Sequence, residues 1–160
     1  MYFRGFKMDI FNSIKIISGG QTGVDRAALD FALEQGIACG GYCPKGRKAE
    51  DGVLSYRYPL IETNNTQYPV RTRRNIMDSD GTIILHPDKM DAGTLLTQKL
   101  CKEVHKPLWI QNLNFPIDKK EFIYWLVLYK IQVLNFAGPR ESFSPGIYIK
   151  AKSFMENSFF

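Results

Sequence analysis

The sequence predicts an α/β protein with a Rossmann-like, three-layer α/β/α fold and a mainly parallel sheet. Short apolar runs that suit buried strands alternate with segments in which apolar residues recur at helical spacing. The 160 residues suit one domain, and 44% hydrophobic with 23% charged residues is ordinary for a protein with a hydrophobic core. Strands separated by helices form βαβ units, and such units build parallel sheets.

The first predicted unit is a strand followed by a helix. The strand covers Ile14–Ser18 and ends in two glycines. The helix begins at Val24, with Gly36 as its C-terminal cap. Residues 37–42 are a weak strand candidate because they contain glycines. Residues 43–65 are expected to be loop with little regular structure.

The rest of the chain continues the alternation of helices and strands. In order, we expect a helix over 69–77, a strand over 82–85, a helix over 94–104, a strand over 108–113, a helix over 118–130 and a strand over 133–136. Ser144 and Pro145 are expected to open a final helix, with serine as the N-cap and proline in the first helical position.

The composition also indicates where the domain begins and in which cellular compartment the protein resides. Residues 1–13 are interpreted as an N-terminal extension and residues 14–160 as a single domain. Residues 1–11 lack the apolar stretch of a signal peptide, and no apolar run is long enough to span a bilayer. Three cysteines, Cys39, Cys43 and Cys101, are too few and odd in number for a disulfide framework. The sequence therefore favours a cytoplasmic protein.

The residues with the clearest functional pattern follow the first strand. In a parallel sheet, ligands bind beyond the carboxyl ends of the strands. The loop there consists of Gly19, Gly20, Gln21, Thr22 and Gly23, with Asp25 and Arg26 in the helix that follows. Glycines let the backbone approach a ligand, and a helix N-terminus can hold a phosphate. Asp25 either contacts the ligand or offsets the helix dipole, and Arg26 is either a ligand contact or a solvated helix residue.

Three further loops belong to the same expected edge of the sheet. Gly93 and Thr94 open a helix, either as a second phosphate-binding turn or as a plain turn capped by Thr94. Lys45, Gly46 and Arg47 suit a phosphate lid or a basic surface turn. Arg140 can reach a ligand anion or pair with Glu141. Arg71 and Arg74 share a face of the helix over 69–77, so they can act together or remain solvated.

Catalytic groups are less clearly defined. Asp25 and Glu50 are candidate acid/base residues, although solvated loop carboxylates are the simpler interpretation for most such acids. No cysteine or histidine spacing completes a metal site. The net charge of +5 comes from scattered cations and not from a continuous stripe, which favours a small anion and disfavours nucleic acid as the partner.

Taken together, the motifs resemble a known family. They are Ser18–Arg26, Cys43–Arg47 with Glu50–Gly52, Arg71-Thr72 with Asn75, Asp78–Thr82, Gly93-Thr94 with Leu96-Thr97, and Asn135 with Ala137–Ser142. In this order they resemble the molybdenum (cofactor) carrier family of the SLOG superfamily of Rossmann-like proteins. That superfamily also includes the lysine-decarboxylase-like phosphoribohydrolases and the DNA-processing protein DprA.

The resemblance implies a nucleotide-like or molybdopterin-like ligand, with molybdenum cofactor or a nucleotide as the expected cofactor, and a homo-oligomer. One residue departs from the related hydrolases, which carry a glutamate three residues after the threonine of their second Gly-Thr loop. Here that position is Thr97, so cleavage of an N-glycosidic bond by that route is not expected. A carrier of a phosphorylated cofactor is therefore preferred, and an enzyme that processes a nucleotide or nucleotide-sugar is the alternative.

Overall fold

The structure is a computed structural model, and it describes residues 10–159. Its centre is a five-stranded sheet in the order β2-β1-β9-β7-β8, in which all neighbouring strands are parallel. The strands are β1 (Lys15–Ile17), β2 (Cys39–Gly40), β7 (Gly81–His86), β8 (Leu108–Asn112) and β9 (Val133–Ala137). The predicted parallel sheet is therefore confirmed, and four of its strands agree closely with the expected ranges.

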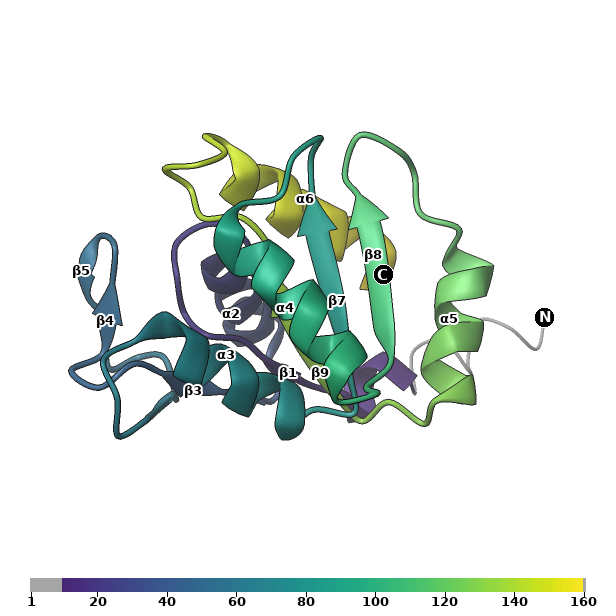
Figure 1. The fold of residues 1–160 in the computed structure, drawn as a ribbon. Coiled ribbons are helices and arrows are strands. Elements are labelled where there is room, and N and C mark those ends of the chain that lie inside the picture. Colours follow the sequence, from purple (N-terminus) through teal and green to yellow (C-terminus); the bar gives the residue numbers. More distant parts are fainter. Residues whose placement is uncertain (1–9, 160) are drawn as a thin grey trace.

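Helices cover both faces of the sheet and complete the three layers (Figure 1). The helices are α2 (Val24–Gln35), α3 (Tyr68–Met77), α4 (Ala92–Glu103), α5 (Lys119–Leu128) and α6 (Ile147–Phe159). One core cluster joins α2, α5 and α6 to the sheet, through Phe31, Phe122 and Phe159 among others. A separate cluster joins α3 and α4 through Ile76, Leu100 and Cys101. Helices α2, α5 and α6 thus share one face of the sheet, and α3 and α4 cover the other.

The segment over residues 43–65 is more ordered than expected. It contains a parallel pair, β3 (Tyr42–Cys43) with β6 (Ile61–Glu62), and an antiparallel hairpin, β4 (Lys48–Ala49) with β5 (Gly52–Val53). The predicted strand over 37–42 is divided between β2 in the main sheet and β3 in the small one. Each of these strands has two residues, which is too short to produce an alternating pattern.

The start of α6 also differs from the prediction. The helix begins at Ile147, after a turn over residues 144–146, so Ser144 is not its N-cap. The carboxylate of Glu141 accepts hydrogen bonds from the N–H groups of Gly146 (2.6 Å) and Tyr148 (3.0 Å) instead. Gly146 has φ +86°, a conformation that favours glycine, and this residue ends the turn.

Residues 10–13 belonged to the predicted extension but pack on the domain. They form a helical turn, and Phe11 is buried with its ring centroid 4.6 Å from that of Phe159. The remainder of the predicted extension, residues 1–9, lies outside the described residues. Within residues 10–159, no helix has the length and apolar character needed to cross a membrane.

The order of the strands has a simple relation to the Rossmann fold. If β9 is counted first and followed by β1, β2, β7 and β8, the observed order reads 3-2-1-4-5. This is the order of the doubly wound dinucleotide-binding sheet. The last strand of this chain therefore takes the place that the first strand has in that fold. The switch point, where connections diverge to the two sides, lies around β9 between β1 and β7.

Candidate functional site

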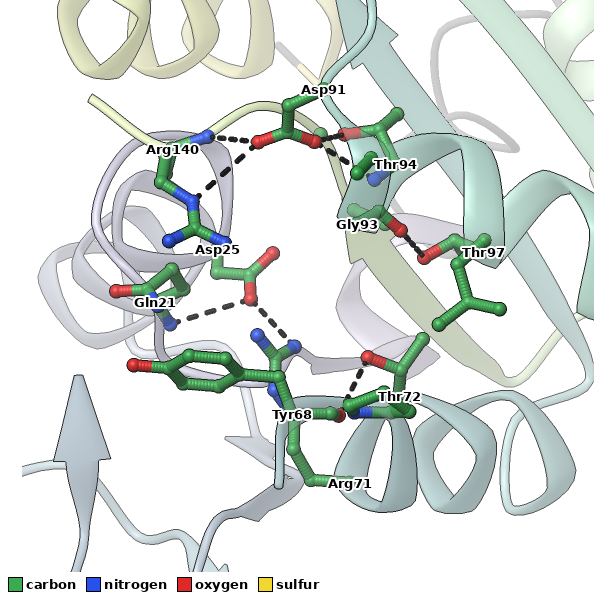
Figure 2. Close-up of a pocket in the computed structure, with 15 residues that line it drawn as sticks. Gln21, Asp25, Tyr68, Arg71, Thr72, Asp91, Gly93, Thr94, Thr97 and Arg140 are labelled. Carbon is green, nitrogen blue, oxygen red and sulfur yellow. Dashed lines mark hydrogen bonds and ion pairs between the residues drawn. The ribbon is translucent and has the colours of Figure 1, made fainter. Parts of the chain in front are cut away.

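A cavity of about 260 Å³ opens at this switch point (Figure 2). Its walls are the loop after β1, the loops that follow β7 and β9, the first turns of α3 and the N-terminus of α4. Of the residues predicted from the sequence to bind a ligand, the cavity brings together Gln21, Asp25, Arg71, Gly93, Thr94, Thr97 and Arg140. The structure thus places residues from four separate segments around one space.

Asp25 and Arg71 form an ion pair in the wall of the cavity. The Oδ2 atom of Asp25 accepts hydrogen bonds from Arg71 Nη1 (3.1 Å) and from the N–H of Gln21 (3.3 Å). Burial raises the pKa of Asp25, and the nearby charge of Asp91 adds to this effect. The charge of Arg71 and the N–H of Gln21 lower the pKa, but the net direction is upward. Asp25 is therefore a buried carboxyl group that holds a proton more readily than an ordinary aspartate.

Gly19 provides the room that Arg71 occupies. A Cβ atom at Gly19 would lie 1.8 Å from Arg71 Nη1 and 2.4 Å from its Cζ. The guanidinium therefore lies directly against the loop after β1. Gly19 does not line the cavity itself, but its missing side chain allows Arg71 to reach Asp25.

The side-chain amide of Gln21 has one occupied end and one free end. Its Oε1 accepts hydrogen bonds from the N–H groups of Thr22 (3.0 Å) and Glu50 (2.9 Å), which fixes the orientation of the amide. Its Nε2 is buried and has no hydrogen-bond partner among the described residues. Gln21 is only 6% exposed. A buried donor without a partner is costly, so this group is suited to a ligand in the cavity.

Asp91 organises the opposite wall. It is the N-cap of α4, and its Oδ1 accepts hydrogen bonds from Thr94 N–H (2.8 Å) and Thr94 Oγ1 (2.6 Å). Its Oδ2 accepts one from the N–H of Arg140 (3.2 Å) and lies 3.7 Å from Arg140 Nε. Asp91, and not Thr94 as expected, is therefore the N-cap of α4, and Thr94 is its hydrogen-bond partner. The Asp-x-x-Thr spacing that marks Asp91 as an N-cap is present in the sequence.

The N-terminus of α4 also faces the cavity. Its first two residues, Ala92 and Gly93, line the space, and their N–H groups have no partner within the helix. Thr97 Oγ1 donates a hydrogen bond to the carbonyl oxygen of Gly93 (3.0 Å). Because the positive end of the helix dipole is here, an anion in the cavity is favoured.

Tyr68 is a cavity residue that the sequence analysis did not identify. Three cations surround its ring: Lys48 Nζ is 5.1 Å, Arg140 Cζ 5.6 Å and Arg71 Cζ 5.7 Å from the ring centroid. Tyr68 is the first residue of α3, one position before the proline that was expected to open the helix. Figure 2 shows Tyr68 and Arg71 on one side of the cavity and Asp91 with Arg140 on the other.

Other residues of the predicted phosphate loop hold the loop in place. Arg26 donates to the carbonyl oxygen of Gly20 (3.2 Å) and makes two 3.0 Å hydrogen bonds to Asp51. Gly20 has φ +75°, and a Cβ there would meet Leu54 and Leu60 rather than the cavity. Neither residue lines the cavity.

Two more predicted residues of this loop connect it to its neighbours. Gly23 has φ +80°, and a Cβ there would lie 2.3 Å from the carbonyl oxygen of Pro139. Thr22 Oγ1 donates to Glu50 and accepts from the N–H of Glu141 (3.1 Å). Both lie outside the cavity and fasten the loop after β1 to the loop after β9.

The predicted lid around Gly46 does not reach the cavity. The N–H of Gly46 donates to Glu62 (2.6 Å), and the N–H of Lys45 donates to the carbonyl oxygen of Asn65 (2.8 Å). Arg47 is buried, and its guanidinium donates to the carbonyl oxygens of Leu54, Ser55, Tyr58 and Leu60. A phosphate-binding role for Arg47 is therefore wrong, since Arg47 organises the segment over residues 47–60.

Glu50 lies beside the cavity and not in its wall. Its carboxylate accepts hydrogen bonds from Thr22 and Ser142 and lies 3.9 Å from Arg140 Nη1. Burial raises the pKa of Glu50, but the hydrogen bonds from Ser142 and Thr22 outweigh this and hold the pKa below its ordinary value. An ionised, fully bonded carboxylate is poorly suited to the acid/base role that the sequence left open.

The cysteines do not contribute to the cavity, and no group of side chains suited to a metal ion is found among residues 10–159. All three cysteines are free; Cys43 and Cys101 are buried and Cys39 is half-buried. None of them lines the cavity. In the part of the chain that the structure describes, no three His, Cys, Asp or Glu side chains are grouped so that they could hold a metal ion.

The fold and the cavity define a doubly wound α/β protein with a cavity at its switch point and a permuted strand order. Residues 16–159 match the model of the circularly permutated YpsA SLOG family, and the chain belongs to this family. The family description agrees with the position of β9, which comes last in the chain and takes the first place in the Rossmann order.

A crystal structure from Syntrophus aciditrophicus SB is similar over nearly the whole chain. That protein is named "Putative molybdenum carrier protein" and is 42% identical in sequence, with a TM-score of 0.86. The match covers 96% of this chain and 99% of that chain. No curated protein gives a significant match. The family resemblance inferred from the sequence motifs is thus confirmed.

Proposed function

We propose that the cavity binds a phosphate-bearing small molecule of nucleotide or molybdopterin type, and that the protein acts as its carrier. The observation that supports this best is that the guanidinium groups of Arg71 and Arg140 and the N-terminus of α4 meet at one cavity. Each is a recognised partner for phosphate. The free Nε2 of Gln21 adds an uncharged donor.

The size of the cavity limits how the ligand binds. Its volume of about 260 Å³ is below the usual range of roughly 300–1,000 Å³ for sites that enclose a whole small molecule. We therefore propose that the phosphate-bearing end enters the cavity and the remainder extends past Tyr68. Tyr68 lines the cavity and is half-buried, and its aromatic ring suits stacking against a flat base or pterin ring.

Molybdenum is proposed as part of the ligand and not as a resident metal ion. The support is the name of the Syntrophus protein, "Putative molybdenum carrier protein", together with the donors of the cavity. Arginine and amide N–H groups suit the oxygens of a phosphate or an oxyanion, whereas a bare metal ion needs thiolate, imidazole or carboxylate ligands. The two carboxylates of the cavity already have partners: Asp25 binds Arg71, and Asp91 binds Thr94. Arg71, Arg140 and Gln21 would hold the anionic end of such a cofactor, which would supply the molybdenum chemistry elsewhere.

An enzyme that processes a nucleotide or nucleotide-sugar is the second candidate. The observation that favours it is Asp25, a buried carboxyl group with a raised pKa in the cavity wall. A carrier returns its ligand intact after prolonged incubation, whereas an enzyme yields a product. Chromatography of the recovered ligand separates the two functions, and loss of turnover in Asp25→Asn would identify the acid.

We also propose a cytoplasmic location and a homo-oligomeric state for the protein. Three free thiols suit the reducing cytoplasm. The homo-oligomer implied by the family stays a prediction, and size-exclusion chromatography with light scattering checks it.

The binding proposal is tested by thermal shift against nucleotides, nucleotide-sugars, pterin cofactors and molybdate. We expect one ligand class to raise the melting temperature of the wild type but not of Arg71→Ala. Arg73→Ala is the matched control, because Arg73 lies two positions along on α3, outside the cavity. If no class raises the wild-type melting temperature, the binding proposal fails.

A further inference from the structure

A second set of hydrogen-bond donors lies next to the cavity and surrounds the carboxylate of Glu50. Oε1 accepts from the N–H of Ser142 (3.2 Å) and from Thr22 Oγ1. Oε2 accepts from Ser142 Oγ (2.5 Å) and lies 3.9 Å from Arg140 Nη1. The donors belong to the loops after β1 and β9, two neighbouring strands of the sheet. Glu50 itself comes from the tip of the β4–β5 hairpin.

These donors are of the kinds that hold a phosphate. A backbone N–H, two hydroxyl groups and a guanidinium are all common partners of phosphate oxygens. The position also agrees with the fold. In the Rossmann order that begins at β9, the loop after β9 is the first βα turn, which in doubly wound proteins carries the diphosphate of the ligand. Here a side-chain carboxylate occupies that position.

Arg140 and Gln21 connect this second position to the cavity. The guanidinium of Arg140 lies between two carboxylates, with Nε 3.7 Å from Asp91 and Nη1 3.9 Å from Glu50. Both distances exceed that of a direct hydrogen bond, so the guanidinium is not committed to either. Gln21 lines the cavity, binds the N–H of Glu50 through Oε1, and keeps its buried Nε2 without a partner among the described residues. An unpartnered buried donor thus lies where the two positions meet.

We propose that Glu50 occupies an anion subsite, and that a ligand with a diphosphate group displaces it. One phosphate then lies in the cavity with Arg71 and the N-terminus of α4. The other takes the place of the Glu50 carboxylate and binds Ser142, Thr22 and Arg140. This inference rests on the proposed function, and it narrows the ligand class from phosphate-bearing molecules in general to those that contain a diphosphate group. A ligand with one phosphate leaves Glu50 in place.

The hairpin offers a matched pair of variants for the test. Glu50 and Asp51 are adjacent at the tip of the β4–β5 hairpin. Glu50 attaches the hairpin to the loop after β1 through Thr22, and Asp51 attaches it to the start of α2 through Arg26. Glu50→Ala and Asp51→Asn each remove one negative charge and loosen the hairpin, but only Glu50→Ala empties the proposed subsite. Isothermal titration of both variants and the wild type with inorganic pyrophosphate and with orthophosphate separates the two effects.

We expect Glu50→Ala to bind pyrophosphate about tenfold or more tightly than the wild type, because the internal competitor is gone. The affinity of Glu50→Ala for orthophosphate should change by no more than about twofold. The affinity of Asp51→Asn for either anion should also change by no more than about twofold. If Glu50→Ala gains equal affinity for both anions, or if both variants gain equal affinity for pyrophosphate, the cause is a general charge effect and the proposed subsite is wrong. If orthophosphate binds but Glu50→Ala binds pyrophosphate no more tightly than the wild type does, the proposed function stands without the subsite. If neither anion binds any of the three proteins, both proposals fail.

Discussion

The guanidinium of Arg71 lies against the Cα of Gly19, at the position where any other residue would carry its side chain. Two residues from distant segments therefore depend on each other. Arg71 reaches Asp25 only because Gly19 has no Cβ, and the loop after β1 gains a charged partner in return. Glycine at this position serves close packing between protein groups, whereas the sequence suggested close approach of a ligand.

This relationship predicts strong coupling between the two residues. Gly19→Ala should lower the free energy of unfolding by about 1–3 kcal/mol, because a Cβ would overlap Arg71 atoms. In an Arg71→Ala background the same change should cost much less, since the overlapping atoms are gone. A double-mutant cycle by urea denaturation measures the difference. Additive costs would mean that the strain at Gly19 comes from elsewhere.

Gly23 is predicted to be the most sensitive glycine of the loop after β1. It combines φ +80° with a Cβ position 2.3 Å from the backbone oxygen of Pro139, which a side-chain rotation cannot relieve. Gly23→Ala should therefore destabilise the protein by about 2–4 kcal/mol. Gly93→Ala is the control, because its Cβ would meet only Asp91 Oδ1, at 3.7 Å. The melting temperature of Gly93→Ala should stay within a few degrees of that of the wild type. A similar loss of stability in Gly23→Ala and Gly93→Ala would show that the contact with Pro139 is not the cause.

Arg47 is predicted to be a structural residue and not a ligand contact. It is 4% exposed, and its guanidinium binds four carbonyl oxygens of the segment that it organises. Arg47→Ala should cost about 2–4 kcal/mol of stability, because those oxygens lose their donor. Lys45→Ala, two positions away and exposed, should change stability by less than about 0.5 kcal/mol. Equal, small effects on stability would contradict this role.

Two buried aspartates should respond to pH in opposite ways. The pKa of Asp25 is raised in the folded protein, mainly by burial, so its contribution to stability is full below the unfolded pKa of about 4 and is lost as the pH rises through the folded value. Burial also raises the pKa of Asp30, but hydrogen bonds from Tyr58, Tyr148 and Arg57 outweigh it and lower the pKa. Its contribution is present above about pH 4 and is lost as the pH falls through the folded value.

Denaturation at a series of pH values checks both signs. The stability of the wild type relative to Asp25→Asn should fall as the pH rises above about 4. Relative to Asp30→Asn, it should fall as the pH drops below that value. Slopes of the same sign for the two variants would show that the environments of these carboxyl groups are misassigned.

The main sheet could be predicted from the sequence because its elements are locally encoded. The run of apolar residues in β1, the helical spacing in α2 and the cap at Gly36 all lie within a few residues of one another. The small sheets could not be predicted in this way. Tyr42 pairs with Ile61, so their short strands depend on contacts between distant residues and leave no local pattern.

The same limit applies to the site. The loops after β1, β7 and β9 were predicted because the ends of parallel strands meet at one edge. Whether a loop residue faces the cavity depends on the fold, so Thr22, Arg26 and Glu50 proved to hold loops together. Tyr68 was missed because an aromatic residue at a helix start has no distinctive pattern. Asp91 was missed although its spacing to Thr94 marks an N-cap.

Whether the cavity at the switch point binds the ligand is tested by isothermal titration with the phosphate-bearing compound that gives the largest thermal shift. Arg140 links the loop after β9 to the cavity, so Arg140→Ala should weaken binding by on the order of 1–3 kcal/mol, or about 5- to 150-fold. Arg73→Ala should leave the affinity unchanged. If wild type and Arg140→Ala bind that ligand equally tightly, the cavity at the switch point is not its binding site, and the central claim is wrong.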